Sequence, residues 1–200
     1  MGATDTEKHV VVIGGDGIGH EIIDAARRVL DAAAGKHGVT ITWEEQKAGG
    51  EAIDAFGEPL PQQTIDACRA ADAVLLGAVG GPKWDNVDPA IRPEKAILGL
   101  RKALGLFCNL RPVKIFPALQ AYSPLKQELV SGVDFVIVRE LTGGIYFGER
   151  EEAHGEGPNE QAWDKETYSR YEIERIMDVA METARRRRGK VTSVDKANVL

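Results

Sequence analysis

The chain has 200 residues, 43% of them hydrophobic and 28% charged, a composition that can bury the core of one or two globular domains and excludes a disordered chain. Its net charge of -6 argues against general affinity for nucleic acid or anionic membranes and favours small metabolites as partners. No apolar run approaches the roughly 18 residues of a membrane span, so we expect a cytoplasmic protein. Two distant cysteines and four histidines predict neither a disulfide framework nor a zinc site.

The first predicted unit is a strand, a glycine turn and a helix. Residues 9–13 form an apolar run that ends in Gly-Gly-Asp-Gly-Ile-Gly, and apolar residues then recur at helical spacing over 22–33. A dinucleotide-binding fingerprint needs glycine or alanine where His20 stands. A tight strand-to-helix connection is therefore favoured, with a Rossmann fold as the alternative.

Two further strands are predicted at 39–43 and 73–79, with a helix over 61–70 between them. Strands that alternate with helices indicate a largely parallel α/β sheet, whose ligands bind beyond the carboxyl ends of the strands. Residues 80–85, Gly-Gly-Pro-Lys-Trp-Asp, directly follow the third strand. Their glycines would let the backbone approach a ligand closely, although a simple surface turn gives the same pattern.

The next helix is predicted to begin at Pro93 and Glu94, because proline suits the first helical position and an acidic side chain suits the positive helix end. Ile97 and Arg101 are four residues apart and so share one face. A face that combines an apolar side chain with a guanidinium suits a ligand with a carboxylate and a hydrocarbon branch. Packing of the aliphatic residues against the core is the alternative.

Two arginines and a tyrosine stand on the following extended segments. Arg111 precedes a proline, whose ring keeps the residue before it extended. Residues 134–138 read as a strand buried on both faces, with Arg139 at its end. A Thr-Gly-Gly turn then leads to a β-rich run at 145–147 that presents Tyr146. This spacing suggests an anion anchor and a proton donor, although a strand-end arginine is also common as a solvated charge.

The last part of the chain changes character twice. Residues 149–164 are too polar to join a core and predict a projecting hairpin or arm, and residues 171–188 predict an amphipathic helix. The four arginines at 185–188 invite a nucleic-acid hypothesis, but cations before a capping glycine are explained by the helix dipole. Residues 191–194 predict a final strand. Lys196 follows it, as an acid/base group or as an ordinary exposed lysine.

Taken together, five motifs resemble those of the 3-isopropylmalate dehydrogenases, members of the β-decarboxylating dehydrogenase superfamily. They occur in order over about 9–200 and are the segments 15–19, 80–85, 109–112, 139–148 and 193–199. The resemblance implies a homodimeric, two-domain α/β fold with parallel and mixed sheets, not a Rossmann fold. Residues 1–106 would carry the cofactor loop, and residues 107–200 the substrate arginines, the arm and the dimer interface.

The resemblance also implies an activity. It is NAD-dependent oxidative decarboxylation of 3-isopropylmalate to 4-methyl-2-oxopentanoate in leucine biosynthesis, with Mg or Mn as a second cofactor. The apolar Ile97 and Leu98 stand where isocitrate enzymes typically carry a serine-containing helix, and this favours isopropylmalate. An isocitrate, homoisocitrate or tartrate dehydrogenase of the same superfamily is the alternative.

Residue roles follow from the same resemblance. The two substrate carboxylates would be held by Arg101, Arg111 and Arg139, and Tyr146 would protonate the enolate carbon. The partner subunit's Lys196 would help remove the hydroxyl proton, and the metal would polarise the ketone that forms. The residues implied in cofactor binding are Gly81, Pro82, Lys83, Trp84, Asp85, Glu94 and Asn198. The alkyl pocket would be lined by Ile97, Leu98 and the partner's Val199.

Two features depart from the family pattern. The family usually has proline where Gly14 and His20 stand, which implies a looser first turn. The family's metal-binding aspartates and adenosine-binding segment lie beyond the position of Leu200, so we expect no metal ligands within this chain. Activity of the 200-residue chain alone is therefore doubtful, and an inactive fragment that keeps only dimerisation surfaces is the alternative from another class.

Overall fold

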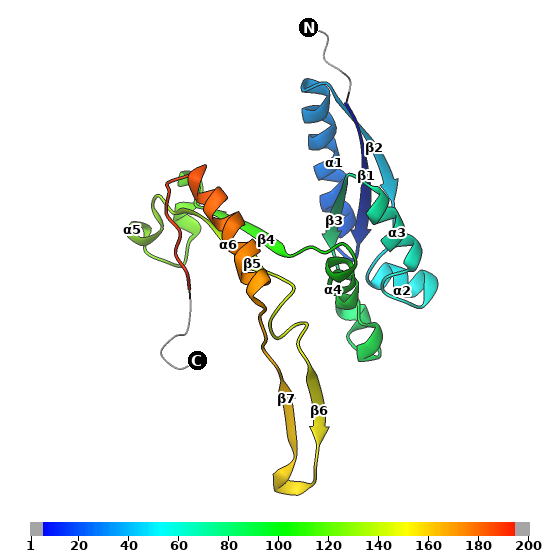
Figure 1. Ribbon diagram of the computed structural model, residues 1–200. Helices are drawn as coiled ribbons and strands as arrows, with labels where there is room; N and C mark the ends of the chain where they lie inside the picture. The colour runs from blue at the N-terminus through cyan, green and yellow to red at the C-terminus, as the bar shows by residue number, and fades with distance from the viewer. Residues whose placement is uncertain (1–5, 195–200) are drawn as a thin grey trace. The chain divides into compact units, whose positions relative to one another are not determined.

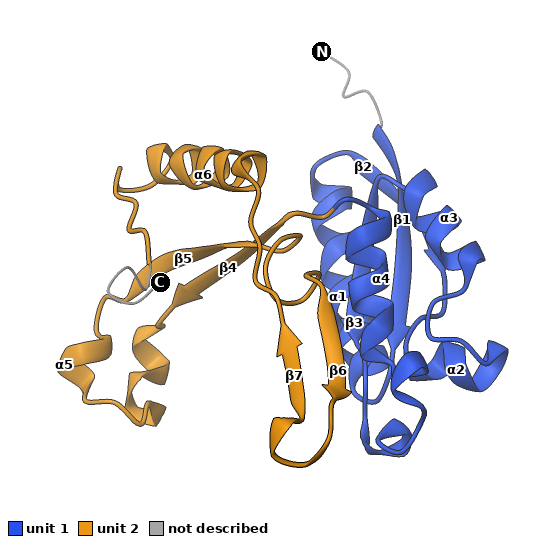
Figure 2. Ribbon diagram, turned by 60° about the horizontal axis from the view of Figure 1, so that its bottom comes forward, with its two compact units in different colours: residues 1–105 blue, residues 106–200 orange. Residues whose placement is uncertain are grey.

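The computed structural model describes residues 6–194, which divide into two compact units, Met1–Gly105 and Leu106–Leu200 (Figures 1 and 2). Among the described residues, no helix is both long and apolar enough to cross a membrane. The first unit contains one three-stranded sheet, and the second contains two two-stranded sheets.

The first unit is built on a parallel three-stranded sheet in the order β2-β1-β3, as the alternation of strands and helices predicts. The strands are β1 (Thr6–Gly15), β2 (Val39–Glu45) and β3 (Ala73–Ala78). The helices are α1 (Gly19–Lys36), α2 (Gly50–Phe56), α3 (Gln62–Ala70) and α4 (Glu94–Ala103). Short 3₁₀ turns lie at Pro82–Trp84 and Pro89–Ile91.

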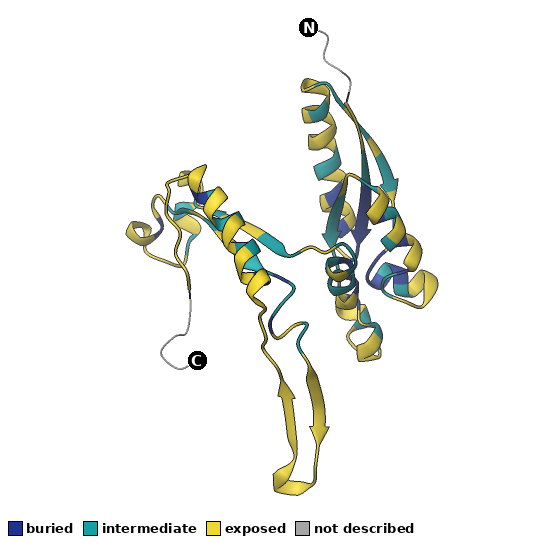
Figure 3. Cartoon of the chain, viewed as in Figure 1, coloured by how far each residue is buried: buried dark blue, intermediate teal, exposed yellow. Residues whose placement is uncertain are grey.

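The core of this unit gathers on the central strand, which is dark blue in Figure 3. Val11 and Ile13 of β1 have no exposed surface, and they cluster with Cys68 of α3 and with Ala96 and Leu100 of α4. Burial of Cys68 raises the pKa of its thiol, and the nearby Glu44 raises it further. The cysteine is therefore a reduced core residue rather than a reactive one.

A buried carboxylate joins three segments of the first unit. Asp16 is only 2% exposed, and its Oδ2 accepts the N–H groups of Gly50 at 2.8 Å and Gly80 at 2.7 Å. Its Oδ1 accepts the N–H of Glu51 at 2.8 Å. Gly49 adopts φ +81°, and a Cβ there would lie 2.7 Å from Asp16 Oδ2, so only glycine fits. The turn after β1, the start of α2 and the loop after β3 are therefore one connected structure.

This connection makes a stability prediction. Asp16→Ala removes the acceptor of three backbone N–H groups, so the free energy of unfolding of the whole protein should fall by about 3 kcal/mol. The matched control is Asp24→Ala, an exposed aspartate on α1, with a change within about 0.5 kcal/mol. Urea unfolding measures both variants. Equal stabilities of the two would contradict the role assigned to Asp16.

The second unit contains two antiparallel pairs of strands and a long helix. The strands are β4 (Cys108–Lys114), β5 (Asp134–Glu140), β6 (Arg150–His154) and β7 (Gln161–Asp164). The helices are α5 (Gln127–Val130) and α6 (Arg170–Arg185), with 3₁₀ turns at Pro117–Tyr122 and Gly157–Asn159. β4 pairs with β5, α6 packs against β5, and β6 pairs with β7 in a hairpin whose strand residues are all exposed.

The end of α6 explains the run of arginines. α6 ends at Arg185, three residues before the predicted end, and residues 186–188 form a turn. Gly189 follows with φ +68° and donates its N–H to the carbonyl of Ala184 at 2.9 Å, so a glycine closes the turn at the helix end as the sequence predicts. Arg185 and Arg186 pair with Glu182, and Arg187 and Arg188 pair with Asp134. The hydrogen bond from Arg187 lowers the pKa of the Asp134 carboxyl below its usual range.

Three predictions about the second unit are wrong. β5 is not buried on both faces, because α6 covers one face while Phe135 and Ile137 stay 46% and 45% exposed. Residues 145–147 form a turn rather than a strand, since the N–H of Gly148 donates to the carbonyl of Gly144 at 2.9 Å. Residues 191–194 form no strand, because no described strand pairs with them.

Candidate functional site

The predicted substrate arginines of the second unit lie on one face of the β4–β5 pair. Asn109 is opposite Arg139, and Arg111 is opposite Ile137. Because side chains alternate along a strand and directly opposed residues share a face, both guanidinium groups project from the same face. Arg111 is oriented there by Asn109, whose Oδ1 accepts its Nε–H at 2.6 Å.

Arg139 is brought next to Tyr146. The guanidinium carbon lies 5.3 Å from the centre of the phenol ring, a cation–π distance. Arg139 is half-buried, yet it forms no ion pair with a described carboxylate of its unit. Its positive charge is therefore available for an anion that lies beside the tyrosine.

The turn that carries Tyr146 is fixed at several backbone positions. Gly144 has φ +78° and donates its N–H to the carbonyl of Thr167 at 2.9 Å. Arg150 donates to the carbonyls of Tyr146 at 3.2 Å and of Ile145 at 3.4 Å. A Cβ on Gly148 would collide with the carbonyl oxygen of Lys165, so glycine is required where this turn packs against the neighbouring backbone.

Glu140 stabilises the start of this turn. Its carboxylate accepts the N–H groups of Thr142 and Gly143, each at 2.7 Å, the Thr142 hydroxyl at 2.7 Å and the Arg175 guanidinium at 2.9 Å. Burial alone would raise the pKa of Glu140, but these four donors outweigh it and hold the pKa below its ordinary value. The carboxylate is thus charged at neutral pH.

The lowered pKa of Glu140 predicts a pH-dependent contribution to stability. A depressed carboxyl pKa stabilises the fold above the unfolded value near 4.5, and this contribution is lost as the pH falls through the lower folded value. Glu140→Gln should therefore be less stable than the parent at about pH 7, and the difference should narrow toward about pH 4. Urea unfolding of the whole protein at both pH values checks this. Glu160→Gln, on the exposed hairpin, is the control and should show no such trend.

The predicted cofactor loop of the first unit is docked on α2. Asp54 accepts Lys83 Nζ at 2.5 Å and Trp84 Nε1 at 3.2 Å, and Lys83 Nζ lies 5.0 Å from the centre of the Trp84 ring. The hydrogen bond from Lys83 is the main cause that lowers the pKa of Asp54. Gly50 is required on α2, since a Cβ there would collide with the Trp84 ring. Pro82 and Asp85 remain exposed beside these contacts.

The space around this loop fits a ligand that approaches the backbone. A Cβ on Gly81 would meet only the Trp84 ring, at 3.6 Å, so the backbone is open there. Glu94 lies at the other side of the loop, with Oε1 2.7 Å from the position of a Cβ on Gly80. These residues can therefore form one wall of a dinucleotide site, as the resemblance implies.

α4 presents the predicted alkyl and carboxylate residues of the first unit. Ala96 and Leu100 turn into the core, which leaves Ile97, Leu98 and Arg101 half-buried on the flank. No described carboxylate of this unit forms an ion pair with Arg101. Core packing thus holds for Leu100 and Leu104, whereas Ile97 and Leu98 keep part of their surface exposed.

Other predicted residues are not placed. Lys196, Asn198 and Val199 lie outside the described residues. Among residues 6–194, no group of three histidine, cysteine, aspartate or glutamate side chains could hold a metal ion. The described residues therefore do not fit a divalent ion by themselves.

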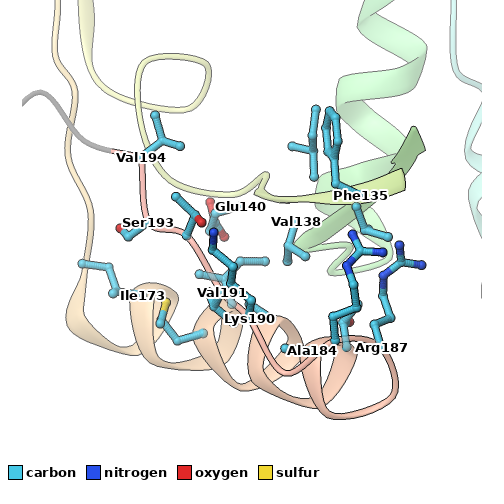
Figure 4. Close-up of a pocket in the computed structure, with 18 of the residues that line it drawn as sticks. Phe135, Val138, Glu140, Ile173, Ala184, Arg187, Lys190, Val191, Ser193 and Val194 are labelled. Atoms are coloured by element: carbon cyan, nitrogen blue, oxygen red, sulfur yellow. The ribbon is translucent and has the colours of Figure 1, made fainter. Parts of the chain in front are cut away.

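A groove in the second unit lies apart from the arginine face. Figure 4 shows it between β5, α6 and residues 190–194, with Val138, Ile173 and Val191 in its lining. Glu140 borders it, but the predicted site residues Arg139 and Tyr146 do not. These two residues are therefore not part of the groove lining.

The sequence analysis did not identify the residues whose hydrogen bonds hold the predicted site residues in place. They are Asp16, Asp54, Glu140, Arg150 and Arg175. Two of them carried a signal, because Asp16 lies inside the glycine turn and Glu140 directly follows Arg139. Asp54 and Arg175 bind partners about 30 residues or more away, which no local pattern reports. Arg150 binds the nearby carbonyls of Ile145 and Tyr146, but an arginine that binds backbone carbonyls leaves no distinctive spacing in the sequence.

Comparison with known proteins identifies the family of the chain. The family described as isocitrate/isopropylmalate dehydrogenase matches residues 9–200. The chain belongs to this family. A 3-isopropylmalate dehydrogenase of Vibrio parahaemolyticus is 54% identical over 199 residues, which are 98% of this chain and 55% of that protein. One from Oceanobacillus iheyensis is 56% identical over 97% of this chain and 52% of its own length.

The family's solved structures share the fold. A β-decarboxylating dehydrogenase of Thermococcus kodakarensis is 37% identical, with a TM-score of 0.69 over 96% of this chain and 50% of its own. An isocitrate dehydrogenase of Methylococcus capsulatus is 33% identical, with a TM-score of 0.68 over 92% of this chain and 49% of its own. The predicted fold class is confirmed. The chain spans about half the length of the curated relatives it matches.

Proposed function

We propose that the whole protein is an NAD-dependent 3-isopropylmalate dehydrogenase of leucine biosynthesis, which acts as a cytoplasmic homodimer. It would convert 3-isopropylmalate and NAD+ to 4-methyl-2-oxopentanoate, carbon dioxide and NADH, with the hydroxyl proton that is released balanced by the proton that the enolate carbon takes up. The observation that carries the proposal is the Arg139 guanidinium stacked 5.3 Å from the Tyr146 ring, on the same face as Arg111. Relatives that are 54% and 56% identical bear the name of this enzyme and support it.

The arginines suit the charge of the substrate. Isopropylmalate is a dianion, and guanidinium groups bind carboxylates through paired, charge-assisted hydrogen bonds. Arg111 and Arg139 project from one face of the β4–β5 pair in the second unit, and Arg101 stands on α4 in the first. Arg101 and Arg139 are half-buried, and no described carboxylate of its own unit forms an ion pair with either, so a substrate carboxylate would satisfy them.

The α4 flank suits the hydrocarbon branch. Ile97 and Leu98 lie half-buried outside the core cluster, next to Arg101 on the same helix. Burial of an isopropyl group against them gains free energy that a carboxylate in the same place would not. We assign these two residues, with the partner's Val199, to the alkyl pocket.

Different residues would bind the cofactor and transfer protons. Residues 81–85 with Glu94 and Asn198 would hold NAD, which would supply hydride-acceptor chemistry at the hydroxyl carbon. The partner subunit's Lys196 would take the hydroxyl proton. Loss of carbon dioxide then leaves an enolate, whose carbon takes the phenol proton of Tyr146, and solvent returns that proton. Because the described residues hold no fitting metal ligands, no step is assigned to Mg or Mn.

Exposed surfaces support the homodimer. Both strands of the β6–β7 hairpin are exposed, and Trp163 on it is 42% exposed. α6 likewise leaves Ile173 and Met181 about half exposed, at 52% and 47%. Apolar side chains in such positions suit a subunit interface.

A substrate comparison tests the function. The purified whole protein should reduce NAD with 3-isopropylmalate at a kcat/KM at least about a hundredfold above that with isocitrate, because a methyl-rich branch fits Ile97 and Leu98. NADH absorbance follows both reactions, with homoisocitrate and tartrate as further substrates. A preference for isocitrate would assign the protein to the other branch of its family, which the Methylococcus structure represents.

Tyr146→Phe tests the proton donor. The variant keeps the ring under Arg139 but loses the phenol proton, so kcat should fall by about 10² while KM changes much less. Steady-state kinetics of the whole protein measure the effect, with a thermal melt to confirm an intact fold. A variant that turns over at the parent rate would remove Tyr146 from the mechanism.

A further inference from the structure

We propose that Glu140 and Arg175 are positioning residues, which hold the turn between Arg139 and Tyr146 so that the phenol stays under the guanidinium. The inference rests on the proposed function, because it assigns Arg139 and Tyr146 to substrate. Neither Glu140 nor Arg175 belongs to the set that would touch the substrate. Their effect passes through the backbone of residues 140–146.

The first support is the position of Glu140 in the strand. It follows Arg139 directly, so the two side chains project from opposite faces of β5. Arg139 faces the arginine side, whereas the Glu140 side chain is 9% exposed and faces α6. One peptide unit joins the two residues, so hydrogen bonds that fix the Glu140 carboxylate also restrain the backbone at Arg139.

The second support is the set of groups that the Glu140 carboxylate accepts. Oε2 accepts the N–H groups of Thr142 and Gly143, and Oε1 accepts the Thr142 hydroxyl. These bonds reverse the chain within three residues of the strand end. Gly144, next along, is bound to the Thr167 carbonyl at 2.9 Å, so the path to Tyr146 is fixed.

Arg175 connects this turn to α6. Its Nη2 donates to Glu140 Oε1 at 2.9 Å and also contacts the Thr142 hydroxyl. The guanidinium carbon lies 4.5 Å from the centre of the Phe107 ring and 5.0 Å from that of Tyr171. Its Nε is buried without a partner among the described residues. A planar guanidinium that stacks on aromatic rings and binds a carboxylate is a role that lysine cannot reproduce.

The arrangement explains a difference between two arginines. Glu140 neutralises Arg175, whereas Arg139, which projects from the other face of β5, forms no ion pair with a described carboxylate of its unit. One cation is used for structure, and the other stays free for substrate. Since a displacement of about 1 Å can cost about 10² in rate, a loosened turn should slow the proton transfer without removing the donor.

The test uses the whole protein with 3-isopropylmalate and NAD. Arg175→Met keeps most of the apolar volume and should lower kcat at least about tenfold, and Arg175→Lys should not restore the parent value. The matched control is Arg170→Met on the same helix, whose side chain is 91% exposed and pairs with Glu174. It should leave kcat within about twofold.

A double-mutant cycle separates positioning from general loss of stability. If Arg175 acts through Tyr146, Arg175→Met should lower kcat no further in a Tyr146→Phe background. A purely structural defect would lower kcat by the same factor in both backgrounds and would overturn the inference. Thr142→Val, which removes the hydroxyl that Glu140 and Arg175 share, provides the same cycle if Arg175→Met does not fold.

The outcomes distinguish the two proposals. Parent-like kcat in both Arg175→Met and Thr142→Val, with a slow Tyr146→Phe variant, would overturn the positioning role and leave the proposed function intact. A parent protein that does not turn over 3-isopropylmalate would overturn the proposed function and this inference together.

Discussion

In each unit, a carboxylate at the end of a strand accepts several backbone N–H groups. Asp16 does so after β1 and Glu140 at the end of β5. Sharp turns leave N–H groups without helical or sheet partners, and such groups are costly when buried. An ionised carboxylate satisfies several at once and is stronger than a neutral acceptor. Asp16 binds the start of the loop proposed to meet the cofactor, at Gly80, and Glu140 binds the start of the turn that carries Tyr146.

The two carboxylates join different segments. Asp16 joins α2 to the loop at Gly80, and the same helix then holds Lys83 and Trp84 through Asp54. Glu140 joins the β5 turn to α6 through Arg175. In each unit, a loop proposed to touch ligand is thus held from behind by a helix. This arrangement keeps exposed side chains such as Tyr146 in place without burying them, because their backbone carries the restraint.

The distribution of charge follows the same division. Most arginines near carboxylates are paired, including Arg175 and the run at the end of α6. Arg139 and Arg101 are half-buried and form no ion pair with a carboxylate of their units within residues 6–194. A half-buried guanidinium loses part of its hydration, and without a counter-ion nothing in the protein replaces the lost interactions. An anionic ligand would replace them with charge-assisted hydrogen bonds. The desolvation of these two arginines thus lowers the stability of the protein at the positions where substrate binding is proposed.

The sequence by itself determined the parallel α/β unit, the boundaries of its strands to within two or three residues, and the motifs that identify the family. These features arise from periodicity and turn chemistry, which act over a few neighbouring residues. Only the tertiary structure decided that Phe135 and Ile137 stay exposed, and that residues 145–147 turn back rather than extend. It also decided the partners of Asp16 and Glu140, which lie up to 64 and 35 residues away. Local sequence fixes what a segment can form, whereas the partners of a buried charge depend on which segments the whole fold brings to it.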